Sequence, residues 1–86
     1  MDYQNVIRYP LMTEVTSRLL ETENKLVFIV DMKATKRDIK KAVEKLYDLK
    51  VSKVNVLITP KNEKKAFVKL HPDYKATDTA IKLGLL

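Results

Sequence analysis

The chain has 86 residues, which fits one domain with a modest core and leaves little volume for an enclosed substrate cavity. It has no cysteine and a single glycine, which excludes disulfides, cysteine zinc sites, thiol nucleophiles, P-loops and dinucleotide-binding turns. Its 17 Lys and Arg residues outnumber its 11 Asp and Glu residues, and the resulting net charge of +6 makes a polyanionic partner plausible.

The first predicted helix follows Pro10. Thr13 is placed to cap it, and Met12, Val15 and Leu19 recur at the three-and-four spacing of one buried face. The polar residues 21–24 end this helix. Residues 25–31 then predict a strand, and the unbroken apolar run at residues 26–30 indicates that both of its faces are covered.

A second predicted helix begins after Thr35, which forms a capping-box pattern with Asp38. Its apolar residues make one continuous stripe, which we expect to be buried: Ile39, Ala42, Val43, Leu46 and Leu49. The charged residues of the same segment lie mostly off this stripe. The sequence therefore predicts an amphipathic helix that packs by one face.

Two strands and a last helix follow. Apolar and polar residues alternate over residues 51–58, and again over residues 64–70. Between them, residues 59–62 read Thr-Pro-Lys-Asn, with proline in the position that a tight turn favours. His71 and Pro72 stop the second strand, and residues 77–83 predict a short closing helix.

These elements indicate an α/β (α+β) fold with a small mixed β-sheet of three to four strands. A strand–helix–strand crossover gives two strands that run in the same direction. If the last strand inserts between them, the sheet contains a split β-α-β unit with helices packed on it. No apolar run approaches the ~20 residues of a membrane span, and the first ten residues lack a signal-peptide core. We therefore expect one domain over residues 1–86, with no membrane insertion, in the cytoplasm.

Charge is distributed unevenly along the chain. Residues 1–24 carry a net charge of −2 and residues 25–86 a net charge of +8. Lys and Arg displace condensed counterions from phosphates, so this basic body suits a nucleic acid. A solvated lysine-rich surface explains the charge equally well, and both interpretations stay open at this point.

The strongest candidate site is the cation cluster of Lys36, Arg37, Lys40 and Lys41. Two pairs of like charges four residues apart destabilise a helix by a few tenths of a kcal/mol each. Helix stability alone would favour alternating charges, so we interpret the cluster as a phosphate-binding surface.

The predicted hairpin carries further candidates. Phe67 lies between Lys65 and Lys69 on one face of its strand, an arrangement that suits base stacking with phosphate contacts. The alternative, a core position for Phe67 beneath the closing helix, is the favoured one for that residue alone. Lys61, Lys64 and Lys65 form a basic tip, and Lys53 and Asn55 share a face of the preceding strand.

Catalytic chemistry is not indicated. His71 is the only histidine, and no glycines of a nucleophile elbow surround Ser17 or Ser52. We expect no enzyme activity, no catalytic residues, no metal, no cofactor and no small-molecule substrate. A small sheet-based enzyme acting on acyl phosphates would need an arginine in a glycine-bearing loop, which Gly84 is too late in the chain to provide.

Residues 34–47 resemble the central helix of the large-subunit ribosomal protein twenty-three family. Thr13-Glu14 after a proline, and residues 24–28, are similar to the opening motifs of that family. Residues 51–56 and 64–70 match its two closing strands. The motifs occur in the right order at natural spacing over nearly the whole chain, which makes the resemblance specific.

The resemblance implies a structural constituent of the large ribosomal subunit, bound to its rRNA beside the exit of the nascent-peptide tunnel. It implies as partners the neighbouring ribosomal proteins, the signal recognition particle and the secretion channel. The docking acid of the family falls on Glu14. The tight turn at residues 59–63, in place of a long hairpin loop, resembles archaeal members. That departure disfavours the ribosome-bound chaperone of bacteria as a partner.

We therefore expect rRNA to contact the basic and amide side chains of the body: Arg8, Asn24, Lys25, Lys36, Arg37, Lys40, Lys41, Lys53, Asn55, Lys61, Lys64, Lys65 and Lys69. The alternative function is a free-standing RNA-binding regulatory module of the RRM type. Such a module needs paired exposed aromatic residues on central strands, for which only Phe67 is a candidate.

Overall fold

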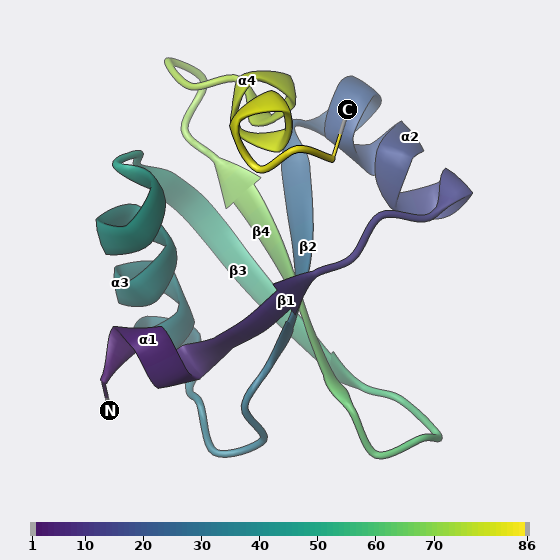
Figure 1. Ribbon diagram of the computed structural model, residues 1–86, viewed down its shortest axis with the longest axis vertical. Helices are drawn as coiled ribbons and strands as arrows, with labels where there is room; N and C mark the ends of the chain where they lie inside the picture. The colour runs from purple at the N-terminus through teal and green to yellow at the C-terminus, as the bar shows by residue number, and fades with distance from the viewer. Residues whose placement is uncertain (1, 86) are drawn as a thin grey trace.

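A computed structural model describes residues 2–85 (Figure 1). Its elements in chain order are α1 (Tyr3–Val6), β1 (Ile7–Pro10), α2 (Glu14–Glu23), β2 (Lys25–Val30), α3 (Lys36–Tyr47), β3 (Val51–Ile58), β4 (Lys64–Leu70) and α4 (Ala76–Lys82). The elements expected from residue 13 onward are all present within a residue or two. The short helix α1 and strand β1 were not predicted.

The four strands form one sheet in the order β1-β2-β4-β3. Each neighbouring pair is antiparallel. Strand β4 lies between β2 and β3, which run in the same direction but share no ladder. The α+β class and the split β-α-β unit are therefore confirmed, and the added strand β1 pairs with the free edge of β2.

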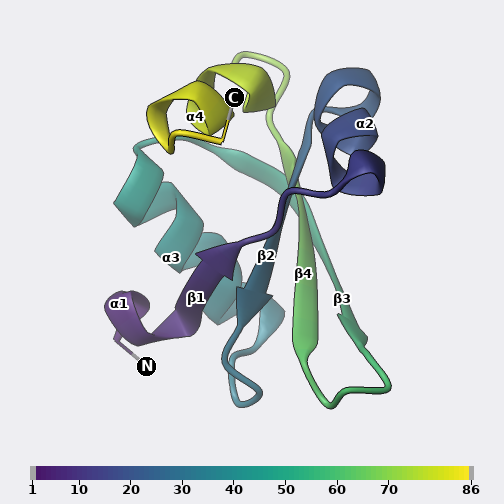
Figure 2. The same cartoon turned by 45° about the vertical axis from the view of Figure 1, so that its right-hand side comes forward.

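One face of the sheet packs against the helices and forms the core. Figure 2 shows α1 and α3 on this side of the strands, with α4 above them. The largest fully buried side chains come from this layer: Phe28, Ile39, Leu70, Val6, Val30, Val43 and Val68. Phe28 stacks on Tyr47 of α3, with ring centroids 5.6 Å apart and planes 9° from parallel. The core thus fixes where α3 lies along the sheet.

Strand β2 is buried on both faces, as its apolar run predicts. Leu26, Phe28 and Val30 belong to the core cluster. Val27 and Ile29 point to the other face, yet each is only 3% exposed. The chain that leaves β1 runs alongside this strand, because Leu11 N donates a hydrogen bond to Val27 O at 2.8 Å.

The buried face of α2 is not the predicted one. Thr16 and Leu20 are buried, whereas Val15 is 67% exposed, and Met12 and Leu19 are only half-buried. A polar residue is tolerated inside because the Thr16 hydroxyl is satisfied locally: it accepts a hydrogen bond from Thr13 N at 2.6 Å and donates one to Thr13 O at 3.2 Å. The capping interaction thus sets the rotation of this helix.

The apolar stripe of α3 is correct in its first two turns and wrong at Leu46. Ile39, Ala42 and Val43 are buried, but Leu46 is 42% exposed. Tyr47 takes the inward position of the last turn by stacking on Phe28. A regular three-and-four pattern does not reveal which residue meets the end of the sheet.

The β3–β4 hairpin closes through the predicted turn. Asn62 N donates to Thr59 O at 2.9 Å, and Asn62 has a φ of 62°, a left-handed conformation that asparagine tolerates. At the other end of the hairpin, the pairing register shifts between Val51 and Lys53. Ser52 is therefore an extra residue in this edge strand, and both Val51 and Val54 point into the core.

Candidate nucleic-acid interface

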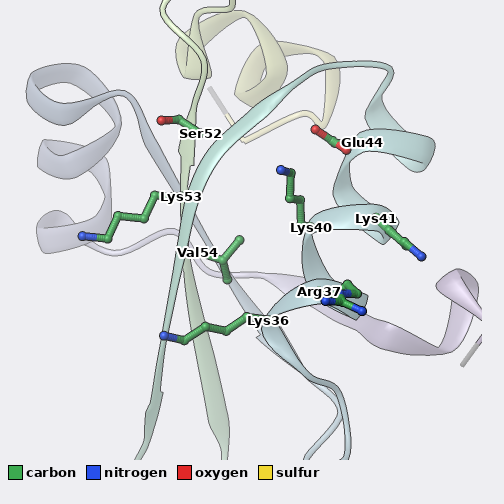
Figure 3. A pocket seen from close by; sticks show the side chains of 8 residues that line it. All are labelled: Lys36, Arg37, Lys40, Lys41, Glu44, Ser52, Lys53 and Val54. Carbon is green, nitrogen blue, oxygen red and sulfur yellow. The ribbon is translucent and has the colours of Figure 1, made fainter.

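An open groove of about 670 Å³ lies between α3 and the edge strand β3 (Figure 3). Its lining is mostly basic: Lys36, Arg37, Lys40, Lys41, Glu44, Ser52, Lys53 and Val54. Glu44, the acidic member, is held at the rim because Val51 N donates a hydrogen bond to its Oε2 at 2.9 Å. The groove therefore combines cations of α3 with one engaged carboxylate, while the side chain of Lys53 on β3 extends away from α3.

The start of α3 is fixed by the predicted capping box. Asp38 N donates to Thr35 Oγ1 at 3.1 Å, and Thr35 N donates to Asp38 Oδ2 at 3.0 Å. The backbone hydrogen bond from Thr35, followed by the one from its side chain, lowers the pKa of Asp38 below its usual value. This closed local arrangement defines where the first turn begins, and that turn carries Lys36 and Arg37.

The four cations of α3 lie on two sides of the helix. In Figure 3, Lys36 and Lys40 extend over the side that faces β3, whereas Arg37 and Lys41 extend away from it. Burial of Ile39, Ala42 and Val43 forces this arrangement, because it leaves the remaining positions of the helix to solvent. The cluster is thus a ridge along α3 whose four cations line the groove, with Lys36 and Lys40 on the side that faces β3.

The predicted rRNA-binding cations differ in whether the protein already engages them. Arg8 approaches Asp31 at 3.9 Å, and Lys25 forms an ion pair with Glu23 at 3.2 Å. Lys64 Nζ donates to the carbonyl of Ala34 at 2.6 Å. Within residues 2–85, no ion pair is formed by the other eight: Lys36, Arg37, Lys40, Lys41, Lys53, Lys61, Lys65 and Lys69.

The two predicted asparagines have different surroundings. Asn24 ends α2 with a φ of 56°, donates from Nδ2 to Tyr74 O at 2.8 Å, and accepts from Ala76 N at 2.7 Å through Oδ1. Its side chain ties the first turn of α4 to the junction of α2 and β2, a role that its sequence position did not reveal. Asn55, in contrast, is exposed on β3, and its side chain makes no hydrogen bond within the described part of the chain.

The hairpin candidates lie on the sheet face opposite the core. Alternation along β4 turns Ala66 and Val68 inward, so Lys65, Phe67 and Lys69 point outward. The expectation that Phe67 is core beneath the closing helix is therefore wrong. The pairing of β4 with distant strands determines the face on which Phe67 lies, and no local pattern in the sequence shows that face.

The predicted docking acid lies apart from these cations. Glu14 occupies the first turn of α2, and its side chain is 90% exposed, with Arg18 at 3.8 Å. Val15 beside it is also exposed. Figure 1 places α2 and α3 on opposite sides of the molecule. Glu14 and the cationic ridge therefore face different surroundings.

One interaction near the outer face was missed in the sequence. Tyr9 donates from its hydroxyl to Glu63 at 3.0 Å, although the residues are 54 positions apart. This hydrogen bond raises the pKa of Tyr9. Tyr47 and Tyr74 pack against the core, so of these three tyrosines Tyr9 is the exposed one.

The described residues contain no group of three or more histidine, aspartate or glutamate side chains arranged to hold a metal ion. His71 lies 3.4 Å from Asp73 through Nδ1, in an exposed pair at the end of β4. No helix among the described residues is long and apolar enough to cross a bilayer.

The chain matches the sequence model of a known protein family. A sequence model of the family described as Ribosomal protein L23 matches residues 5–79. The matched segment covers most of the chain, from the end of α1 into α4, and it includes Glu14 and all the candidate rRNA-binding residues.

Proposed function

Because the chain belongs to the ribosomal protein L23 family, and so is a large-subunit protein of the cytoplasmic ribosome, we propose that its basic surface binds large-subunit rRNA. Members of this family are structural components rather than enzymes. The site of binding that we propose is the rRNA beside the exit of the nascent-peptide tunnel, as the resemblance of the sequence motifs implies.

The observation that carries the proposal is the groove between α3 and β3. Lys36 and Lys40 extend beside it from adjacent turns of α3, without ion-pair partners among residues 2–85. Holding like charges four residues apart costs helix stability. A phosphate backbone offsets that cost, because it supplies the missing anions and releases condensed counterions. We assign Arg37 and Lys41, on the far flank of the ridge, to the same role.

The test compares two double variants that remove the same charge. Lys36→Gln with Lys40→Gln changes the ridge beside the groove, and Lys50→Gln with Lys82→Gln changes exposed lysines elsewhere. Binding to a large-subunit rRNA fragment is measured as a function of salt concentration. We expect the first variant to weaken binding to every RNA sequence. The plot of the logarithm of the binding constant against the logarithm of salt concentration should become less steep, by about 0.9 for each phosphate that the protein no longer neutralises. The control variant should keep a slope close to that of the wild type.

An equal slope in both variants would mean that Lys36 and Lys40 face solvent and that the proposal for this groove is wrong.

A free-standing RNA-binding regulator is the second candidate, favoured by one observation, the outward aromatic Phe67 on a central strand. Sedimentation with large subunits through high salt separates the two, because only a ribosomal component stays bound in stoichiometric amount.

We further propose a protein-docking role for the surface around Glu14. This acid is exposed on a helix distant from the ridge, so a protein partner can reach it while rRNA occupies α3. The partners implied by the resemblance are neighbouring ribosomal proteins, the signal recognition particle and the secretion channel. The tight turn at residues 59–63 supports the archaeal type within the family, with the signal recognition particle as the favoured factor.

A further inference from the structure

The outer face of the β3–β4 hairpin is a second surface with the chemistry of a nucleic-acid partner. The strand register aligns its outward side chains in rows across the sheet. Phe67 of β4 is paired with Val27 of β2 on one side and with Asn55 of β3 on the other. In Figure 2 this side of β3 and β4 has no helix over it along most of its length. The Phe67 ring is therefore partly exposed on this face, between the buried Val27 and the exposed Asn55.

Cations surround this ring. Lys65 and Lys69 lie two residues before and after Phe67 on the same face. The neighbouring row pairs Lys69 with Lys53 of the edge strand, and Figure 3 shows Lys53 extending away from α3. Antiparallel partners are close neighbours, and like charges directly opposite each other are destabilising. Nothing within the described residues forms an ion pair with these three lysines.

The nearby acidic groups are already engaged. Glu63, at the turn, accepts the hydroxyl hydrogen bond of Tyr9, and Glu23 pairs with Lys25 at the far end of the face. The positive charge around Phe67 is therefore not neutralised by the protein itself. An anionic partner gains from this charge, whereas a basic or neutral protein surface does not.

Phe67 has no packing role in the core that would explain its position. The core cluster includes its strand neighbours Ala66 and Val68 but not Phe67 itself. It remains partly exposed, with the exposed amide of Asn55 directly opposite. Unpaired bases bind proteins by stacking on aromatic rings while amides hydrogen-bond to the base edges.

We propose that this outer face binds an unpaired RNA nucleotide, whose base stacks on Phe67 while Lys65, Lys69 and Lys53 contact the flanking phosphates. The inference rests on the proposed function, since it specifies a single-stranded element of the RNA that the protein binds. Asn55 is assigned to the edge of the stacked base. Among the described residues, those that line the groove beside α3 include no aromatic ring, so we assign the ridge to contacts with the RNA backbone.

The test uses the full chain and two probes of equal length. One is a short single-stranded RNA that carries a fluorescent adenine analogue, and the other is a blunt-ended RNA duplex. Phe67→Leu removes the ring but keeps an apolar side chain, and Phe67→Tyr keeps the ring as a matched control. We expect Phe67→Leu to weaken single-strand binding roughly 5- to 150-fold, the range that stacking of one base corresponds to. Duplex binding should not change, and Phe67→Tyr should bind both probes as the wild type does.

The saturated complexes provide a second measurement. Moving the analogue from its neighbouring bases onto Phe67 should change its fluorescence with wild type but not with Phe67→Leu, and equal changes in the two complexes would overturn the proposal. Equal single-strand affinity of Phe67→Leu and wild type would overturn it too. If Phe67→Leu instead releases a neighbouring protein from the large subunit with RNA binding intact, the face is a protein contact and the inference is wrong.

The Lys36→Gln, Lys40→Gln variant distinguishes a failure of the Phe67 stacking site from a failure of the proposed rRNA-binding function. Loss of rRNA binding in that variant, with no effect of Phe67→Leu, leaves the ridge assignment in place and removes only the stacking site. If neither the Lys36→Gln, Lys40→Gln variant nor Phe67→Leu changes RNA binding, both the ridge assignment and the stacking site are wrong.

Discussion

Ile39 and Leu46 are both apolar residues of α3, yet only Ile39 is enclosed. Ile39→Ala should lower the free energy of unfolding by about 2–5 kcal/mol, because it leaves a cavity in the core. Leu46→Ala should cost about 1 kcal/mol or less, since much of that side chain already contacts water. Urea unfolding of the free proteins measures both. Equal losses would show that the end of α3 is buried in solution.

Asp38 gives the capping box of α3 a defined pH dependence. Its pKa is lowered in the folded protein by the hydrogen bonds from Thr35. The stabilisation is therefore complete above the ordinary pKa of 3.8 and is lost as the pH falls through the lower folded-state value. Asp38→Asn keeps an acceptor for Thr35 N but no charge.

The measurement for Asp38 is thermal unfolding of both proteins at neutral and at acidic pH. Wild type should be the more stable at neutral pH, and the difference should shrink in acid, where Asp38 is protonated in both states. A difference that does not depend on pH would contradict the role of the charged carboxylate.

At the scale of the elements, α4 depends on a side chain from another part of the chain. Lys75, its own N-cap residue, makes no capping hydrogen bond, and Asn24 Oδ1 accepts from Ala76 N instead. We expect Asn24→Gly to keep the left-handed turn at the end of α2 but to lose both side-chain hydrogen bonds. The free energy of unfolding should fall by about 1–3 kcal/mol.

Hydrogen exchange locates the effect of Asn24→Gly. The amides of α4 should exchange faster in the variant, whereas those of α3 should keep the protection of the wild type, apart from the change in global stability. Uniform loss of protection over both helices would mean that Asn24 supports the whole fold rather than the docking of α4.

Local signals predicted the elements from α2 onward because their causes are local. Both capping threonines and the Thr59–Asn62 turn act through residues three positions apart in the chain. Strand β1 and the face of Phe67 were not predicted correctly because they depend on pairing with distant strands. The candidate cations of α3 were identified from spacing, but the engagement of Asn24 and Lys64 was not, since their partners lie 30 or more positions away.

At the scale of the whole molecule, opposite charges occupy different regions. Glu14 on α2 is exposed, and the cationic ridge of α3 lies on the other side of the molecule. If Glu14 is a docking contact, ribosomes that carry Glu14→Lys should assemble normally but bind the signal recognition particle more weakly. The loss should be greatest at low salt, where charge pairs are least screened.

A helix-dipole effect is the alternative account of Glu14. An acid in the first turn stabilises a helix by about 0.3–1 kcal/mol, and its reversal would then lower stability without changing factor binding. Factor affinity for purified mutant ribosomes at two salt concentrations separates the two accounts. Arg18→Gln is the control, because it removes the nearby ion-pair partner and leaves the acid in place.

The position of β4 between β2 and β3 sets the order in which a newly synthesised chain can fold. The sheet lacks one of its two inner strands until residues 64–70 have left the ribosome that makes them. Before that point, β2 and β3 have no hydrogen-bonding partner on the edges that face the gap, although α3 between them is complete. Helix formation therefore precedes closure of the sheet, which joins segments about 40 positions apart. Nascent chains released before residue 64 should remain unfolded and expose strand edges that promote aggregation.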